Sequence, residues 1–309
     1  MAFSLSGLTA YVEQEKIPLI TRTLFGSQTG KIFAKQTGIK SSATVKLLNT
    51  SAQFLTAGCT WAPSGTTSIT NRLLTVANIQ VMESLCIKDL NAYYTQTLLR
   101  VGDNPSDLPF EQLYSTLKAD YIANQLEIAY WQGATTSWDA NLNKFNGYIS
   151  LIDTAAASVN GNPTGITTGT GIVAANVIGI FNGVYALIPA QILRAPDTAI
   201  FCGTDTFRVY AAAVVAANLY SYTGQTDAQF ELTISGTAIK VIGLDGLTGT
   251  NRIFAGRKSN FYIGTDMENE EEMFKMWESV DNGDYRFKAD FKAGVQVAIP
   301  SELVSFKLV

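Results

Sequence analysis

The feature that most restricts the fold is a long helical pattern that runs from Asp107 to Gln132. Pro109 is tolerated in its first turn, where the N–H has no helical partner, and Gly133 is suited to end it. At 1.5 Å per residue, roughly 26 helical residues extend about 39 Å, which is long for a globular domain. An apolar stripe along this helix predicts the face that is buried: Phe110, Leu113, Tyr114, Leu117, Tyr121, Ile122, Leu126 and Ile128.

Two alternating segments predict a long two-stranded ribbon over residues 40–87. In the first segment, Ala43, Val45 and Leu47 share one face. The second segment, 77–87, follows a turn-rich stretch, and its apolar face holds Ala77, Ile79, Val81, Leu85 and Ile87. An isolated ribbon is marginally stable in water, so this one needs something to lie on, such as a neighbouring subunit. Trp61 would lie at the tip, where a monomer exposes it, and we expect it to dock on a neighbour.

The rest of the chain predicts an α+β fold with an arm-like segment over residues 1–39. A helix, a strand and a second helix are expected near 172–187, 198–202 and 205–217. Further strands are expected at 230–234, 238–242, 252–255, 261–263, 285–291, 295–299 and 304–308, and a short helix at 271–279.

The composition is 47% hydrophobic and 16% charged, against about 25% charged residues in an average soluble domain. Such a chain either spans a membrane or covers much of its surface with partners. The uncharged segment 171–193 is amphipathic and is interrupted by Pro189, which predicts a helix that does not span a membrane. No basic segment followed by an apolar one marks the beginning of the chain, so no secretory signal is predicted.

Charge is distributed unevenly along the chain. Residues 1–50 hold six basic and two acidic residues, a net charge of +4, with Lys16 and Arg22 among the bases. Residues 266–309 hold ten acidic and five basic residues, a net charge of −5, with Asp266 and Glu270 among the acids. These are either two solvated surfaces or a basic arm of one subunit on an acidic region of another. The overall charge of −4 argues against a protein that grips nucleic acid phosphates.

The sequence contains no histidine, which excludes the Ser-His-Asp triad, the Cys-His pair and histidine-dependent zinc sites. Three widely spaced cysteines form no disulfide framework and suit a reducing cytosol: Cys59, Cys86 and Cys202. We therefore predict no catalytic residue, no cofactor and no metal site.

Two groups of acidic residues leave alternatives open. The cluster of Asp266, Glu268 and 270–272 is expected to be a solvated acidic face, although its oxygens could bind a divalent cation or serve a carboxylate-dependent enzyme. Glu127, near Trp131 on the long helix, is expected to be solvated or paired with a lysine or arginine. The alternative for Glu127 is an ion pair between subunits.

The order of the elements resembles that of the major capsid proteins of tailed double-stranded DNA bacteriophages, which share the Johnson fold. A basic arm, a long hairpin and a long helix that closes on Glu127-Ile-Ala-Tyr-Trp-Gln-Gly133 are followed by a helix–strand–helix unit. The tail phrases are Asn260-Phe-Tyr-Ile-Gly-Thr-Asp266 and Phe291-Lys-Ala-Gly-Val-Gln-Val-Ala-Ile-Pro300. The resemblance implies an N-terminal arm (1–39), an extended loop (40–87), a peripheral domain (88–160 plus 265–309, with spine helix 107–133) and an axial domain (161–264).

The resemblance also implies a function. Copies of the chain would form pentamers and hexamers of an icosahedral shell around DNA, assembled in the host cytoplasm and retained in the virion. Inter-subunit contacts are expected at Lys16, Arg22, Trp61, Glu127, Asp266 and Glu270. Partners would include a portal, decoration proteins and a separate scaffolding protein, unless the chain is already matured. The turn region 56–70 has no lysine for a crosslink. The alternatives are an encapsulin nanocompartment shell and an enzyme that uses Asp266 and its neighbouring glutamates.

Overall fold

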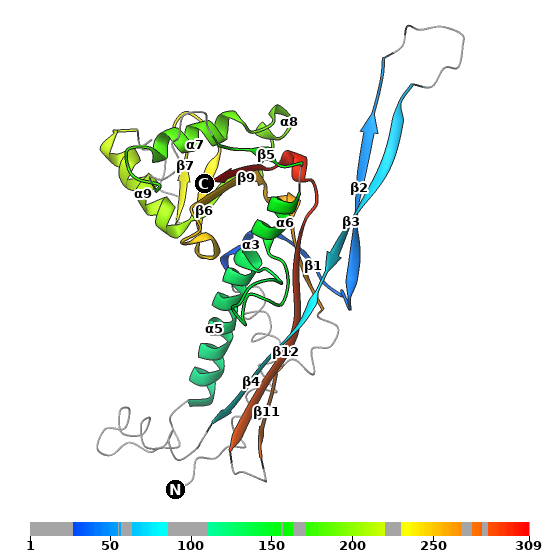
Figure 1. Cartoon of the computed structure of the whole chain (residues 1–309), viewed down its shortest axis with the longest axis vertical. Helices are drawn as coiled ribbons and strands as arrows, with labels where there is room; N and C mark the ends of the chain where they lie inside the picture. Colours follow the sequence, from blue (N-terminus) through cyan, green and yellow to red (C-terminus); the bar gives the residue numbers. More distant parts are fainter. Residues whose placement is uncertain are drawn as a thin grey trace.

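The computed structural model describes residues 27–54, 56, 64–85, 110–155, 157–162, 171–219, 230–266, 274–279 and 284–308. These residues form a mixed α+β molecule with three visible parts (Figure 1). A rounded unit surrounds a six-stranded sheet. An elongated unit pairs a long helix with a five-stranded sheet, and a two-stranded ribbon projects well away from both.

The five-stranded sheet lies beside the long helix α5 (Phe110–Gln132). Its strands follow the order β1-β10-β12-β11, with β4 also paired to β12. Their bounds are β1 Ala34–Gln36, β4 Ala77–Leu85, β10 Phe261–Thr265, β11 Phe274–Glu278 and β12 Tyr285–Val297. The two strands expected in 285–299 are thus one strand of 13 residues. The expected helix at 271–279 is wrong, because 274–278 is strand β11.

The ribbon consists of β2 (Ser42–Ser51) and β3 (Thr66–Thr75), which pair antiparallel along their whole length. The prediction that 77–87 supplies its second strand is wrong. That segment forms β4, which pairs with β12, and the partly buried side chains of Ala77, Ile79 and Val81 pack against the core beneath α5. The alternation of apolar and polar residues correctly predicts a half-buried strand, but it does not indicate which strand pairs with it.

The six-stranded sheet has the order β5-β13-β9-β6-β8-β7. Helices α7 (Val177–Ala186), α8 (Ala190–Leu193) and α9 (Thr204–Ala216) belong to the same unit (Figure 1). Every residue of the central strand β6 is buried. The strands are β5 Val159–Asn160, β6 Thr198–Gly203, β7 Glu231–Thr233, β8 Lys240–Leu244, β9 Arg252–Arg257 and β13 Val304–Lys307.

Sheet membership differs from the expected division of the chain. Strand β13 belongs to the tail segment 265–309 that is expected in the peripheral domain, but it pairs with β9 and β5 in the six-stranded sheet. Strand β10 falls, except for its last residue, within the range expected for the axial domain, but it pairs with β12 in the five-stranded sheet. The predicted apolar face of α7 is buried at Val177, Ile180 and Val184, whereas Val173 and Leu187, also expected on that face, lie outside the helix and are exposed. No helix among the residues described is long and apolar enough to cross a membrane.

The buried face of α5 differs in part from the predicted stripe. Ile122 and Leu126 are buried together with Ala119 and Ala123, whereas Leu117 and Tyr121 are exposed. The two alanines broaden the buried face. The helix is followed by a turn-rich loop and by α6 (Tyr148–Thr154).

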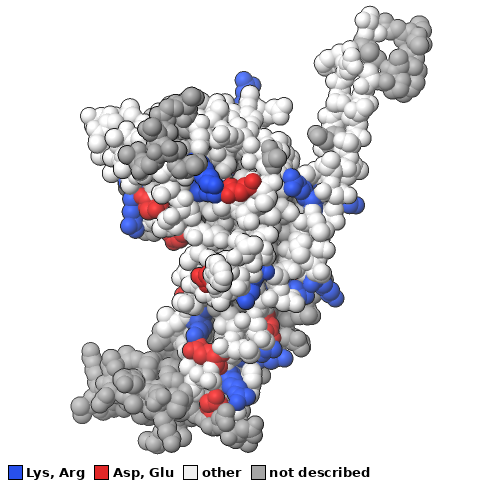
Figure 2. Space-filling view, in the orientation of Figure 1, with Lys and Arg blue, Asp and Glu red and all other residues white. Residues whose placement is uncertain are grey.

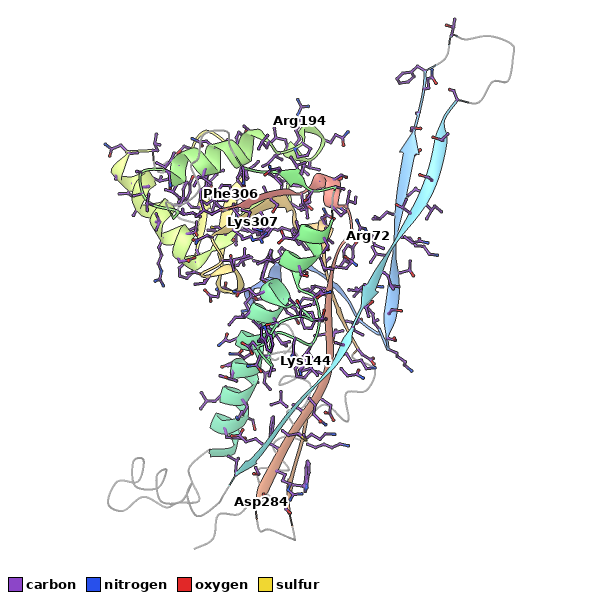
Figure 3. All side chains as sticks on the ribbon, viewed as in Figure 1. Arg72, Lys144, Arg194, Asp284, Phe306 and Lys307 are labelled. Atoms are coloured by element: carbon purple, nitrogen blue, oxygen red, sulfur yellow. The ribbon has the colours of Figure 1, made fainter. Side chains whose placement is uncertain are left out.

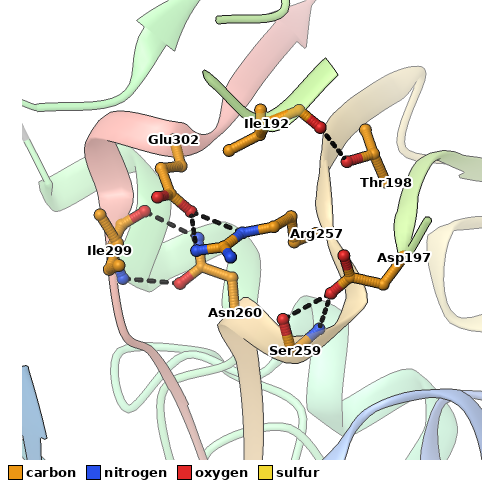
Figure 4. A network of polar contacts seen from close by, with 8 residues as sticks. All are labelled: Ile192, Asp197, Thr198, Arg257, Ser259, Asn260, Ile299 and Glu302. Atoms are coloured by element: carbon orange, nitrogen blue, oxygen red, sulfur yellow. Dashed lines mark hydrogen bonds and ion pairs between the residues drawn. The ribbon is translucent and has the colours of Figure 1, made fainter. Parts of the chain in front are cut away.

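Two neighbouring connections run between the six-stranded sheet and the five-stranded sheet. One runs from β9 to β10 through η3 (Lys258–Asn260), and the other runs from β12 to β13 through η4 (Pro300–Glu302). Asn260 connects them, because its Nδ2 donates to the Ile299 carbonyl at 2.7 Å and its Oδ1 accepts from the Ile299 N–H at 2.6 Å (Figure 4). Arg257 also donates to Glu302 across these connections. The two sheets are therefore braced against each other.

Residues 27–36 are part of the chain's own core, which corrects their assignment to an arm. Helix α3 (Gln28–Ile32) leads into Phe33, whose ring stacks on Phe261 of β10 at 4.5 Å between centroids. The same ring meets Phe201 of β6 and Trp131 of α5 edge-on, at 5.1 and 5.9 Å. Phe33 thus joins both sheets to the long helix. The first 26 residues of the expected arm lie outside the described residues.

Candidate assembly interface

The ribbon presents an apolar face that no described part of its own chain covers. Leu48 and Ile69 are cross-strand partners and are 70% and 65% exposed; Leu73, further along the same face, is 57% exposed. Figure 3 shows side chains projecting from β2 and β3 well beyond the rest of the molecule. Large apolar side chains grouped on a projecting surface are typical of a protein interface. We call Leu48, Ile69 and Leu73 the outer face of the ribbon.

The opposite face of the ribbon is buried at its base. Val45 and Leu74 pack with Ile39, Val76 and Ala298 in a small core of their own. The pleat therefore separates a face that holds the ribbon on its subunit from a face that is free for another molecule.

Very little charge accompanies these apolar side chains. Between residues 42 and 75 the sequence has only two charged residues, Lys46 and Arg72, and no acid. The surface of the ribbon is accordingly almost uncharged in Figure 2, whereas acidic and basic residues alternate on the elongated unit. An interface here would gain its affinity from apolar burial and backbone contacts more than from ion pairs.

Glu127 is buried inside its own chain, at 3% exposure. Its Oε2 accepts from the Thr29 N–H at 2.8 Å, and its Oε1 accepts from the Thr29 hydroxyl at 2.5 Å. Trp131 Nε1 donates to the same hydroxyl at 2.8 Å. The expectation of a solvated or ion-paired Glu127 is wrong, and the side chain has almost no surface for an inter-subunit pair. Its partners fix α3 to the long helix.

The pKa of Glu127 lies above its ordinary value of 4.5, chiefly because burial disfavours the charged form. Asp245 raises it further, while hydrogen bonds from Thr29 and Ser27 oppose the rise. The native state therefore holds this proton at a pH where the unfolded chain has released it. It follows that the contribution of Glu127 to stability is complete below pH 4.5 and decreases as pH rises through its native pKa.

We predict that the free energy of unfolding of the natural chain, relative to Glu127→Gln, falls as pH rises above 4.5. Glutamine cannot ionise, so it removes the proton-linked difference while it keeps the side-chain volume. Urea unfolding of both proteins between pH 4.5 and pH 8 measures the difference. A difference that stays constant over this range would contradict the prediction.

Asp266 is also buried, and its Oδ2 lies 2.7 Å from the Lys292 ammonium. The expectation that it forms part of a solvated acidic face is therefore wrong. Two further tail acids pair within the tail, Asp290 with Lys288 and Asp284 with Arg286. These internal pairs reduce the acidic charge that the tail can offer to a basic arm of another subunit.

Four of the expected contact residues lie outside the described part of the chain, and their roles stay predictions: Lys16, Arg22, Trp61 and Glu270. The exposed residues of the outer face were not expected from the sequence. The signal that could have found them is the near absence of charge from 42 to 75. Trp138, on the loop after α5, is a further fully exposed aromatic residue.

The described residues include no group of three or more His, Cys, Asp or Glu that could hold a metal ion. Cys202 is buried in β6, and burial raises the pKa of its thiol well above the ordinary value, so it is a poor nucleophile.

Comparison with solved structures identifies the fold. A chain of the satellite phage P4 procapsid that includes the size determination (Sid) protein matches with a TM-score of 0.60 and 12% identity, over 98% of this chain and 96% of that one. The capsid of an empty GTA particle matches at 0.58 and 13%, over 92% and 90%. A chain from Microbacterium phage Oxtober96 matches at 0.56 and 13%, over 91% and 90%. No protein-family model and no curated protein matches the sequence.

The chain has the phage capsid fold. The α+β capsid fold expected from the order of elements and the tail phrases is thus confirmed. The match to the satellite phage P4 procapsid chain covers 98% of this chain, so the projecting ribbon lies within the matched part.

Proposed function

We propose that this chain is the major capsid protein of a tailed phage, a structural subunit that self-assembles into pentamers and hexamers of an icosahedral head. The observation that carries the proposal is the outer face of the ribbon. A chain with the capsid fold exposes Leu48, Ile69 and Leu73 on an element that is held to its own subunit only at its base. Such a ribbon becomes stable along its length when a neighbouring copy covers it.

The parts of the molecule take the following roles in this proposal. The rounded unit with the six-stranded sheet is the axial domain, and the unit with α5 is the peripheral domain with its spine helix. Because contacts between copies are heterologous, each ribbon lies on the next subunit, and rotation closes the ring. The finished head encloses double-stranded DNA without reading its sequence. A separate scaffolding protein and a portal are the partners of such a head, decoration proteins are optional additions to it, and the head is assembled in the host cytoplasm.

The proposal predicts that the purified full chain forms pentamers, hexamers or closed shells. Negative-stain electron microscopy and light scattering, carried out over a range of salt and protein concentrations, measure this. Assembly should persist at high salt, because the outer face is apolar and salt screens only charged contacts. A stable monomer under every condition would contradict the proposed function.

A further inference from the structure

A pair of glycines lies where the base of the ribbon crosses the five-stranded sheet. Gly264 of β10 and Gly294 of β12 are cross-strand partners. A Cβ on Gly294 would lie 2.1 Å from the Thr75 carbonyl oxygen, at the end of β3. A Cβ on Gly264 would lie 3.0 Å from the side chains of Ile39 and Leu74. The ribbon can approach the sheet this closely because both partners lack a side chain.

The residues that flank Gly294 on the same face of β12 hold the ribbon by its backbone. Lys292 Nζ donates to the Lys40 carbonyl at 2.9 Å, just before β2. Gln296 Nε2 donates to the Leu73 carbonyl of β3 at 2.6 Å. Because side chains alternate along a strand, 292, 294 and 296 point to one face, and all three meet backbone atoms at the ribbon base.

The same contact closes a small apolar core. Leu74 is completely buried, and Ile39, Val45 and Val76 pack around it. The Val76 N–H donates to the Ser41 carbonyl at 3.0 Å and continues the ribbon pairing down to the sheet. Burial, hydrogen bonds and close backbone approach thus fix the base on both of its strands.

We propose that Gly264 and Gly294, together with Lys292 and Gln296, form a seat that fixes the direction of the ribbon in the free subunit. These four are positioning residues: they set where the outer face is presented to the next copy. The inference rests on the proposed function for its consequence in assembly, although the seat itself can be tested without assembly. A ribbon whose direction is fixed before contact loses less conformational entropy when it docks on the next subunit.

The test is a graded series of alanine substitutions in the full chain. Gly294→Ala must displace backbone, so it should have the larger effect. Gly264→Ala meets side-chain atoms that can shift slightly, so its effect should be smaller. Gly171→Ala is the matched control, because a Cβ built there has no heavy atom within 4 Å among the described residues, its chain neighbours apart.

Hydrogen exchange of backbone amides in the unassembled subunit is the first readout. In Gly294→Ala, exchange at the base of β2 and β3 should accelerate by at least about tenfold, which corresponds to ~1.4 kcal/mol of local stability. The second readout is the yield and diameter of shells by electron microscopy, which should change in the same order. The control should match the natural chain in both.

The two proposals fail in different ways. If the natural chain never assembles, the proposed function fails. Hydrogen exchange in the unassembled subunit still tests whether the seat fixes the ribbon. If Gly294→Ala shows the same ribbon exchange as Gly171→Ala, the seat is refuted. Should Gly294→Ala not fold, Gln296→Ala removes one hydrogen bond at the same place. It should accelerate exchange at the ribbon base to a smaller extent, and unchanged exchange there would equally overturn the inference.

Discussion

Replacing Leu48 with lysine and Ile69 with aspartate together is expected to prevent assembly at concentrations where the natural chain assembles, and to leave the stability of the isolated subunit unchanged. The two residues are cross-strand partners, so the new side chains form an opposite-charge pair that supports the ribbon. The substitutions remove the apolar surface that a neighbouring subunit would bury. Full burial of one such side chain contributes about 1.5–3 kcal/mol. Even at the lower value, the two side chains together cost ~3 kcal/mol of binding free energy per contact, which raises the concentration needed for assembly by roughly a hundredfold.

The matched control places the same charge pair on Thr50 and Thr67, a polar cross-strand pair on the same face. Thr50→Lys with Thr67→Asp changes charge equally but removes no large apolar side chain. Light scattering as a function of concentration measures assembly, and thermal unfolding of the unassembled subunit measures stability. Equal loss of assembly in both pairs would show that charge, not apolar burial, governs the contact. A lowered melting temperature in the Leu48 and Ile69 variant alone would place these residues in the chain's own core.

The order of elements could be predicted from the sequence, because the signals involved are local. The long helix follows from periodicity and from Gly133 at its end, and α9 and most strands lie within a few residues of their expected bounds. Pairing between distant segments could not be predicted. Alternation in 77–87 has the same form whether its partner is the first ribbon strand or β12, whose paired residues lie 200 (285 − 85) to 216 (293 − 77) positions further along the chain.

The candidate site was harder to predict than the fold, for a physical reason. The identity of an acidic residue says nothing of its burial, and Glu127 and Asp266 are both buried beside partners that are distant in sequence. The identity of a glycine likewise says nothing of which atoms lie close to it. Gly264 and Gly294 belong to the two tail phrases that pointed to the capsid family, but only the structure shows that they are cross-strand partners beneath the ribbon.

Phe33→Ala is expected to lower the free energy of unfolding by about 3–5 kcal/mol, the range for truncating a buried aromatic side chain. Its ring is 4% exposed and contacts rings from both sheets, from α5 and from α6. The cavity would therefore open at the place where the two units join. Domains are stable by only about 5–15 kcal/mol, so the loss is a large share of the total.

The control is the same phenylalanine-to-alanine substitution at a position where the ring is not packed against other residues. Phe54 is fully exposed, so Phe54→Ala should alter stability by no more than about 0.5 kcal/mol. Urea unfolding of both variants measures the contrast, and hydrogen exchange locates it. Amide protection should fall in β6 and in β10 together, because Phe33 contacts Phe201 and Phe261 at once. If protection were lost in one sheet only, or if the two variants were equally stable, Phe33 would not be the residue that couples the units. Residues 27–36 would then be an arm, as the sequence alone suggests.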